Sequence, residues 1–154
     1  MNKKTILNSL IILSFITLSF AYFVEFVLGH EPCNLCKIER IPYIGAIILG
    51  SLLIFLNKWE KIILIMIFLL FIFGAVTSIY HVGIEQDIFS ESLLCELGIS
   101  GNIENSAELL KNLEKTPISC KNVTFRIFGL SLATFNAVLS VVISFIMIKL
   151  IIKK

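Results

Sequence analysis

Four long apolar segments without a charged residue constrain the fold of this 154-residue chain more than any other feature. They are residues 5–24, 41–57, 62–80 and 127–148. About 20 helical residues span a bilayer core about 30 Å thick, and a helix satisfies its backbone hydrogen bonds within the segment. The sequence therefore predicts an all-α membrane protein, a bundle of four transmembrane helices.

The overall composition agrees with this fold class. The chain is 57% hydrophobic and only 16% charged, whereas about a quarter of the residues of a typical soluble domain are charged. The net charge of +2 is small, and the sequence shows neither an internal repeat nor a pattern typical of nucleic-acid binding. We expect a single integral membrane domain over residues 1–154.

The basic residues are distributed unevenly between the two sides of the predicted bundle. The two termini and the turn 58–61 together hold seven of the 13 basic residues and one acidic residue, Glu60. The loops 25–40 and 81–126 hold six basic and ten acidic residues. Because Lys and Arg near the ends of spans favour the cytoplasm, we expect cytoplasmic termini and both of these loops outside.

The N-terminal segment allows one alternative. The N-terminus is similar to a cleavable signal peptide, with Lys3 and Lys4, the apolar residues 6–18 and the triplet Ser19-Phe20-Ala21. The apolar run continues through Val24, which favours an uncleaved first span. Cleavage would still leave both loops outside.

The four cysteines form two pairs, and both pairs lie in the predicted outer loops. Cys33 and Cys36 form a CxxC motif in the first loop, and Cys95 and Cys120 lie in the second. A CxxC disulfide closes a small, often strained ring and tends to be reactive, so thiol–disulfide exchange between the pairs would be possible. The alternative is a non-enzymatic membrane scaffold in which Cys95 and Cys120 staple the loop and stabilise it by about 3 kcal/mol.

Two local features of the outer loops leave structural questions open. The second helix could begin near Pro32, with the CxxC in its first turns and a kink at Pro42, or near Arg40 with Pro42 at its entry. A start near Pro32 would lower the pKa of a nearby thiol, because a helix N-terminus stabilises a thiolate. Residues 106–114 have the spacing of a short amphipathic helix.

A metal site is not expected. Zinc would need two ligands besides the CxxC, and the candidates His30 and His81 border different loops. Cys36 is followed by Lys37, which excludes the haem attachment motif CxxCH.

The residues around the CxxC resemble a known family. The segment Pro32-Cys33-Asn34-Leu35-Cys36, followed by Glu39-Arg40 and Pro42-Tyr43, is similar to the P-C-x-L-C-x-x-x-R-x-P-Y signature of the DsbB-type disulfide bond formation proteins. Residues 80–85 and 129–133 are similar to that family too, with Phe135 before Asn136 where the family often has Trp. The resemblance extends over essentially the whole chain and all four cysteines.

The resemblance implies an enzyme of the bacterial inner membrane. It would reoxidise a periplasmic thioredoxin-fold dithiol oxidase of the DsbA type and pass the electrons to membrane quinone, either ubiquinone or menaquinone. Partner attack on Cys95 would form a mixed disulfide, with Cys120 as the resolving partner. Exchange through Cys120 and Cys33 would then reduce the CxxC, and Cys36 would be the thiolate that contacts the quinone.

Two further residues are candidates for cofactor binding. Arg40 matches the family arginine beside the quinone, where a cation would stabilise both the Cys36 thiolate and a reduced quinone; its alternative role is to snorkel to the interface. His81 lies near the outer end of a span and could handle quinone protons because imidazole titrates near neutral pH. Glu39 is expected to be a solvated neighbour or an ion-pair partner.

The vitamin K epoxide reductase type also combines a CxxC, a loop pair and a helical bundle. Its CxxC lies late in the chain, whereas Cys33 lies early in this one, so the DsbB type is favoured.

Overall fold

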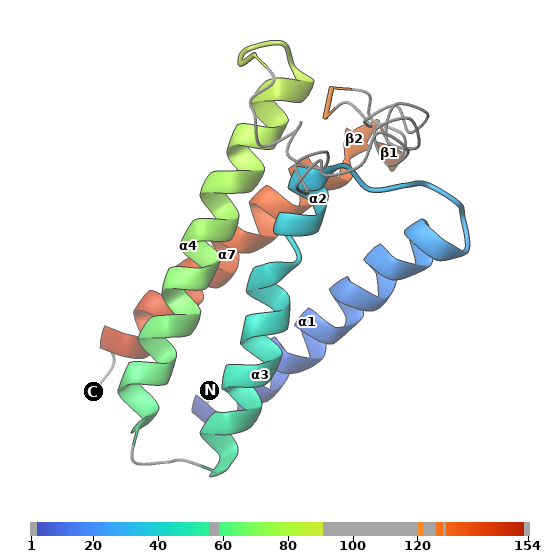
Figure 1. The fold of residues 1–154 in the computed structure, drawn as a ribbon. Coiled ribbons are helices and arrows are strands. Elements are labelled where there is room, and N and C mark those ends of the chain that lie inside the picture. The colour runs from blue at the N-terminus through green and yellow to red at the C-terminus, as the bar shows by residue number, and fades with distance from the viewer. Residues whose placement is uncertain (1–2, 56–58, 91–119, 122–125, 128, 153–154) are drawn as a thin grey trace, which may run out of the picture.

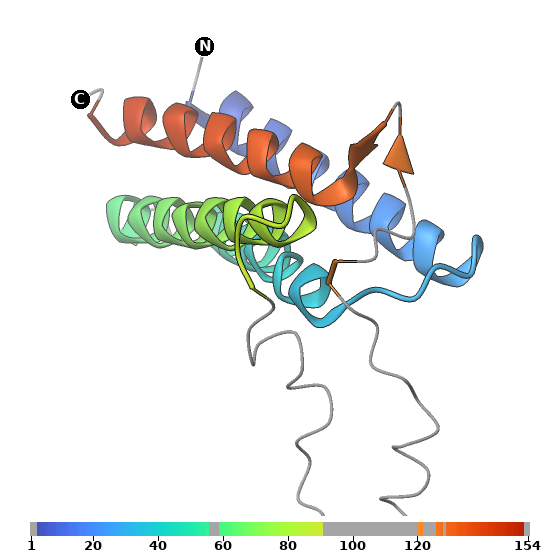
Figure 2. The same ribbon diagram turned by 90° about the horizontal axis from the view of Figure 1, so that it is seen from above.

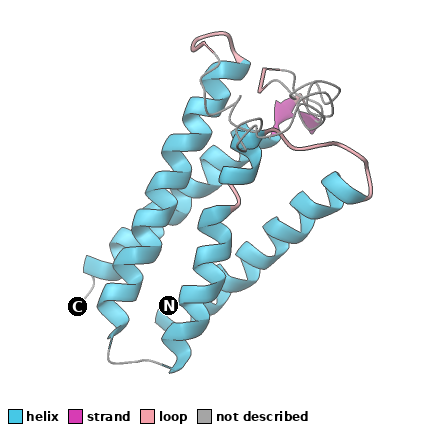
Figure 3. Ribbon diagram, in the orientation of Figure 1, coloured by secondary structure: helices cyan, strands magenta, loops and turns pink. Residues whose placement is uncertain are grey.

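The computed structural model describes residues 3–55, 59–90, 120–121, 126–127 and 129–152 (Figure 1). In chain order the elements are α1 (Lys3–Phe26), α2 (Asn34–Ile38), α3 (Ile41–Phe55), α4 (Glu60–Glu85), β1 (Arg126–Ile127), β2 (Leu130–Ser131) and α7 (Leu132–Ile152). Figure 3 shows that helices dominate the described part of the chain. The expected amphipathic helix at 106–114 lies outside the described residues.

Three of these helices are long and apolar enough to cross a membrane: Lys4–Phe26 of α1, α4 and α7. The described part of α3 covers 15 residues, or about 22 Å at 1.5 Å per residue, which is shorter than the apolar thickness of a bilayer. The structure therefore supports an all-α membrane protein with three candidate spans. The expected fourth span at 41–57 is not confirmed.

The last helix begins later than the expected segment 127–148. Arg126 pairs with Ser131 and Ile127 with Leu130 in a small antiparallel hairpin, and Gly129 turns the chain with φ of +83°, a conformation that glycine adopts at little cost. Ser131 Oγ then accepts a hydrogen bond from the Thr134 N–H at 3.2 Å, which caps the first turn of α7. The length and hydropathy of segment 127–148 do not reveal this turn, so the expected span included it.

The second helix expected from the sequence is divided into α2 and α3. The start expected near Pro32 corresponds to α2, and the start expected near Arg40 corresponds to α3. Cys33 is the N-cap residue of the short α2, which ends before Glu39. Pro42 is the second residue of α3, where a missing backbone N–H costs no hydrogen bond. The CxxC therefore lies on its own short helix, directly before α3.

The helices pack in the order α1, α3, α4, α7, and the most extensive contact joins α4 to α7 (Figure 2). Side chains of all four form one buried core, which includes Leu10 of α1, Tyr43 of α3, Phe71 of α4 and Met147 of α7. Both termini lie at one end of the bundle, whereas α2 and the hairpin lie at the other (Figure 1). This arrangement brings the CxxC and the segment that leads into α7 to the same end.

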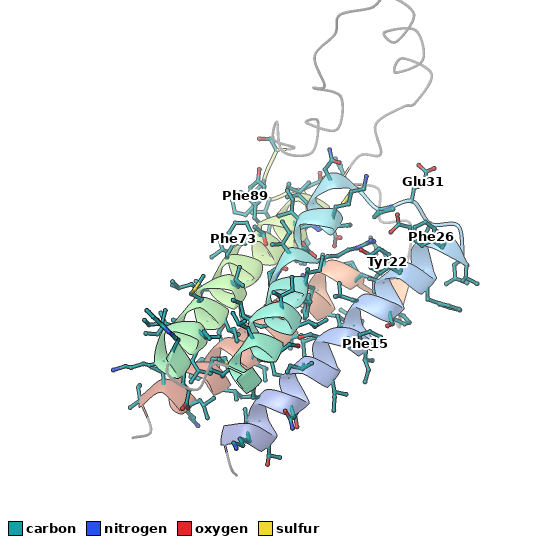
Figure 4. The ribbon with its side chains drawn as sticks, turned by 60° about the horizontal axis from the view of Figure 1, so that its bottom comes forward. Phe15, Tyr22, Phe26, Glu31, Phe73 and Phe89 are labelled. Atoms are coloured by element: carbon teal, nitrogen blue, oxygen red, sulfur yellow. The ribbon has the colours of Figure 1, made fainter. Side chains whose placement is uncertain are left out.

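The distribution of apolar and polar side chains in the bundle is typical of a protein surrounded by lipid. Phe15 and Phe26 on the outside of α1 (Figure 4) are 64% and 75% exposed, and Phe145 of α7 is 66% exposed. Ser14 and Ser140, by contrast, are fully buried. Large apolar side chains face outward and small polar ones pack between helices, as in membrane bundles.

We expect Gly74→Ala to destabilise the bundle. A Cβ at Gly74 would lie 2.8 Å from Cγ of the rigid Pro42 ring and 3.4 Å from Ser140 Oγ, so α3, α4 and α7 would have to separate. The expected loss in unfolding free energy is about 1–3 kcal/mol, measured by thermal unfolding in detergent.

Gly45→Ala is the matched control for that variant. Its Cβ would meet only the flexible end of Leu70, which can rotate away, so a much smaller change is expected. Equal losses for Gly45→Ala and Gly74→Ala would contradict the role of Pro42.

Candidate functional site

The two CxxC sulfurs lie against each other. The Cys33 and Cys36 thiols are free, and their Sγ atoms are 2.7 Å apart. Cys33 Sγ also accepts a hydrogen bond from the Cys36 backbone N–H at 3.3 Å, because Cys33 is the N-cap of α2. Cys33 is only 7% exposed, whereas Cys36 is half-buried, so Cys36 is the more accessible sulfur of the pair.

A third cysteine belongs to the same site. Cys120 is disulfide-bonded and 2% exposed, and it lies in one buried cluster with Cys33, Leu35 and Ile84. The structure therefore brings together three of the four cysteines expected to act in catalysis. The fourth, Cys95, lies outside the described residues.

His81 lies beside Cys33, although 48 residues separate them in the chain. Its Nε2 is 3.6 Å from Cys33 Sγ, and its Nδ1 is 2.8 Å from Glu39 Oε1. Because a carboxylate only accepts hydrogen bonds, Glu39 keeps one imidazole proton on Nδ1, and Nε2 faces the sulfur. His81 can then accept a proton from Cys33 or return one.

Glu39 is the site residue that sequence reasoning underestimated. It is not a solvated neighbour, since it is only 7% exposed; the alternative of an ion-pair partner is right, and the partner is His81. Its other oxygen, Oε2, accepts a hydrogen bond from Asn136 Nδ2 at 2.9 Å. No local signal links residues 39 and 136, but a carboxylate three positions after Cys36 could have marked it as part of the site.

The negative charge of the dithiol lies on a different sulfur from the one expected from the sequence, which was Cys36. The hydrogen bond from the Cys36 thiol, assisted by His81, lowers the pKa of Cys33 to about 5, although burial alone would raise it. The same hydrogen bond, together with burial, raises the pKa of Cys36. In the resting dithiol the thiolate is therefore on Cys33, not on Cys36, because the Cys36 N–H donates to its sulfur and His81, holding a proton on Nε2, faces it.

We expect the alkylation rate of Cys33 in the dithiol form to stay nearly constant from pH 8 to pH 6 and to fall only below about pH 5. A thiol with the ordinary pKa of about 8.5 would instead lose about tenfold in rate for each pH unit below that value. The rate can be followed by mass spectrometry with a small alkylating agent.

Cys36→Ala removes the thiol donor, so its profile should shift to higher pH. A tenfold fall per pH unit between pH 8 and pH 6 in the unaltered chain would show that Cys33 is not the thiolate.

Arg40 is held inside the protein instead of extending to the surface. Its Nη1 lies 2.5 Å from Glu25 Oε2 and its side chain is 13% exposed. The guanidinium also lies 4.8 Å from the centre of the Tyr22 ring, which favours a cation. These contacts tie the start of α3 to the end of α1, four residues after Cys36.

The residues around Cys36 fit a quinone in part. A guanidinium has five N–H donors, and the bond to Glu25 uses one of those on Arg40, so others can bind an acceptor such as a quinone carbonyl oxygen. His81 does not fit direct quinone contact: it is 2% exposed, and its two ring nitrogens face Glu39 and Cys33.

The same site also contains three groups of the kind that bind metals. The ligand atoms of Cys33, Cys36 and His81 lie within 4.8 Å of one another. His81 and the CxxC therefore lie together in space, although they border different loops in the sequence. Tetrahedral zinc, with Zn–S bonds of about 2.3 Å, keeps two sulfurs about 3.8 Å apart. The separation of 2.7 Å suits a dithiol that exchanges with a disulfide better than a zinc site.

Comparison with known proteins agrees with this geometry. The family model of the disulfide bond formation protein DsbB matches residues 3–150. The uncharacterized protein RP370 of Rickettsia prowazekii (strain Madrid E) is 30% identical over 143 residues, which cover 91% of this chain and 83% of that protein. No solved structure matches. With a family match along nearly its whole length and a dithiol packed near a disulfide-bonded cysteine, the chain belongs to the DsbB family of disulfide bond formation proteins.

Proposed function

We propose that this protein is a thiol oxidase of the bacterial inner membrane. It would reoxidise a periplasmic thioredoxin-fold dithiol oxidase of the DsbA type and pass the electrons to membrane quinone. The observation that carries the proposal is the burial of Cys33 in one cluster with the disulfide-bonded Cys120. In this proposal α3 is the fourth span, the termini are cytoplasmic and the cysteine loops are periplasmic.

The first step is exchange with the partner. A partner thiolate attacks Cys95 Sγ, which breaks the Cys95–Cys120 bond and leaves Cys120 as a thiolate. The second partner thiol, losing its proton, attacks the partner sulfur of the mixed disulfide and releases Cys95. The partner is now oxidised by two electrons, and the loop pair is reduced by two.

The second step moves the electrons to the CxxC. The Cys120 thiolate attacks Cys33 Sγ of the oxidised Cys33–Cys36 pair, and Cys36 leaves as a thiolate. Cys95 then attacks Cys120 Sγ and Cys33 leaves in turn. The hydrogen bond from the Cys36 N–H and the proximity of His81 stabilise Cys33 as a leaving group, which supports this order.

The third step returns the CxxC to the disulfide. Bound quinone supplies an acceptor for two electrons and two protons, and Arg40 would hold it next to Cys36. A proton that moves from Cys36 to Cys33 across the 2.7 Å between their sulfurs leaves the thiolate on the accessible Cys36. The two protons released as the Cys33–Cys36 bond forms are the one shared by the two sulfurs and the one held on His81 Nε2.

The test uses the purified protein in detergent with added ubiquinone-1 or a menaquinone analogue and a reduced thioredoxin-fold oxidase. The loss of quinone absorbance should match the partner dithiol oxidised, mole for mole, and should vanish in Cys36→Ser. If no quinone is reduced and Cys120 stays in a disulfide that never exchanges, the protein is instead a membrane scaffold with a structural loop disulfide.

A further inference from the structure

A chain of hydrogen bonds leads from the buried His81 through Glu39 to Asn136 and on to Ser78 and Tyr43. Glu39 Oε2 accepts a hydrogen bond from Asn136 Nδ2, and the same amide nitrogen donates to Ser78 Oγ at 2.7 Å. Asn136 Oδ1 accepts a hydrogen bond from the Tyr43 hydroxyl. The network joins α3, α4 and α7 to the link that follows the CxxC.

The hydrogen-bond partners determine which polar atoms of this network donate and which accept. Ser78 Oγ donates its own proton to Gly74 O at 2.8 Å, so it can only accept from Asn136. Tyr43 donates its hydroxyl proton to Asn136 Oδ1. The Asn136 amide therefore cannot be turned over, since the reversed amide would bring its oxygen against the Glu39 carboxylate.

The fixed amide determines how Glu39 meets His81. With Oε2 bound to Asn136, Oε1 is left for Nδ1–H of His81 at 2.8 Å. That contact turns Nε2 towards Cys33 Sγ. A polar network in which every member has its hydrogen-bond partner resists rearrangement. Groups that do not contact a sulfur therefore help to fix the orientation of His81.

We propose that Asn136, oriented by Tyr43 and Ser78, is a positioning residue that holds Glu39, and through it the His81 tautomer that exchanges a proton with Cys33. The inference deepens the proposed function and rests on it for the proton step in turnover.

The charged and titratable groups around His81 in the described part of the chain come from three segments. Cys33 and Cys36 come from the CxxC, Glu39 comes from the link before α3, and Glu85 comes from α4 itself, with Oε1 3.8 Å from His81 Nε2. Glu85 remains in place in every variant proposed below, so any change in Cys33 titration reports on the Glu39 side of the imidazole.

The experiment measures Cys33 in the resting protein, without quinone or partner. The full chain is purified in detergent with the CxxC as a dithiol, and thiolate absorbance at 240 nm is followed against pH, with Cys33→Ala as the blank. The rate of Cys33 reaction with oxidised glutathione is measured at pH 6 and pH 9. We expect Asn136→Ala to react about tenfold more slowly than the unaltered chain at pH 6, the effect of one lost hydrogen bond, and within about twofold of it at pH 9.

Conservative variants separate positioning from folding. Tyr43→Phe, which removes only a hydroxyl, should shift the thiolate titration in the same direction by less, and Asn136→Gln should recover part of the loss. Thr77→Val is the matched control, because the Thr77 hydroxyl bonds only to carbonyls of its own helix, Phe73 O and Gly74 O, among the described contacts. Its profile should equal that of the unaltered chain.

An Asn136→Ala profile that superimposes on that of the unaltered chain would overturn the proposal. An equal shift in Thr77→Val would overturn it as well, since any disturbance of the bundle would then suffice. Failure of the proposed function gives a different result: no quinone is reduced by the unaltered chain, while the Cys33 titration still shifts in Asn136→Ala.

Discussion

A chain that lacks both Cys33 and Cys36 is expected to oxidise at most one equivalent of reduced partner and then stop. In the proposed sequence of exchanges the loop pair accepts two electrons from the partner, and the CxxC is the only route by which they leave. Without it, the disulfide at Cys120 is consumed once and cannot be restored. The expected result is full loss of steady-state turnover with a stoichiometric first exchange.

The measurement is a rapid-mixing experiment that counts partner disulfides formed per protein, with and without quinone. The Cys33→Ala/Cys36→Ala variant should give one equivalent in both cases. The unaltered chain, with both pairs oxidised at the start, should give two equivalents without quinone and more than two only when quinone is present. Cys120→Ala is the complementary control and should give none. Full turnover without Cys33 and Cys36 would contradict the proposed function.

His81→Gln is expected to produce the second largest effect. His81 Nε2 is the basic atom that the structure brings next to Cys33 Sγ, and loss of a positioned general acid–base group typically costs about 10²–10⁴-fold in rate. The loss should be greatest near pH 6 and smaller near pH 9, because solvent hydroxide can then remove the Cys33 proton. Single-turnover reoxidation of the CxxC dithiol by quinone, followed by stopped-flow absorbance, reports this step directly.

The chain contains one other histidine, which provides the control. His30 lies in the link between α1 and α2, so His30→Gln should reoxidise at a rate close to that of the unaltered chain. If His81→Gln is equally fast at pH 6, water rather than imidazole removes the proton.

The membrane class and the general position of the site follow from local composition. Uncharged apolar segments partition into lipid wherever they occur in a sequence, so α1, α4 and α7 could be predicted one at a time. An even number of predicted crossings also placed both cysteine loops at one end. The structure has α2 at the end opposite the termini, and Cys120 packs against Cys33 and Leu35 there. Boundaries were less predictable, because the hairpin before α7 depends on Gly129 and Ser131 and not on hydropathy.

The chemistry of the site depends on contacts between distant residues. Cys33 and His81 are 48 positions apart, and Glu39 and Asn136 are 97 apart, so no spacing rule connects them. A sequence motif can identify the two thiols, but the position of their shared proton depends on which donor faces which sulfur. The sequence alone determined that this chain enters a membrane with two cysteine pairs; the packing of α3, α4 and α7 decided that Cys33 carries the negative charge, because only packing brings His81, Glu39 and Asn136 to it.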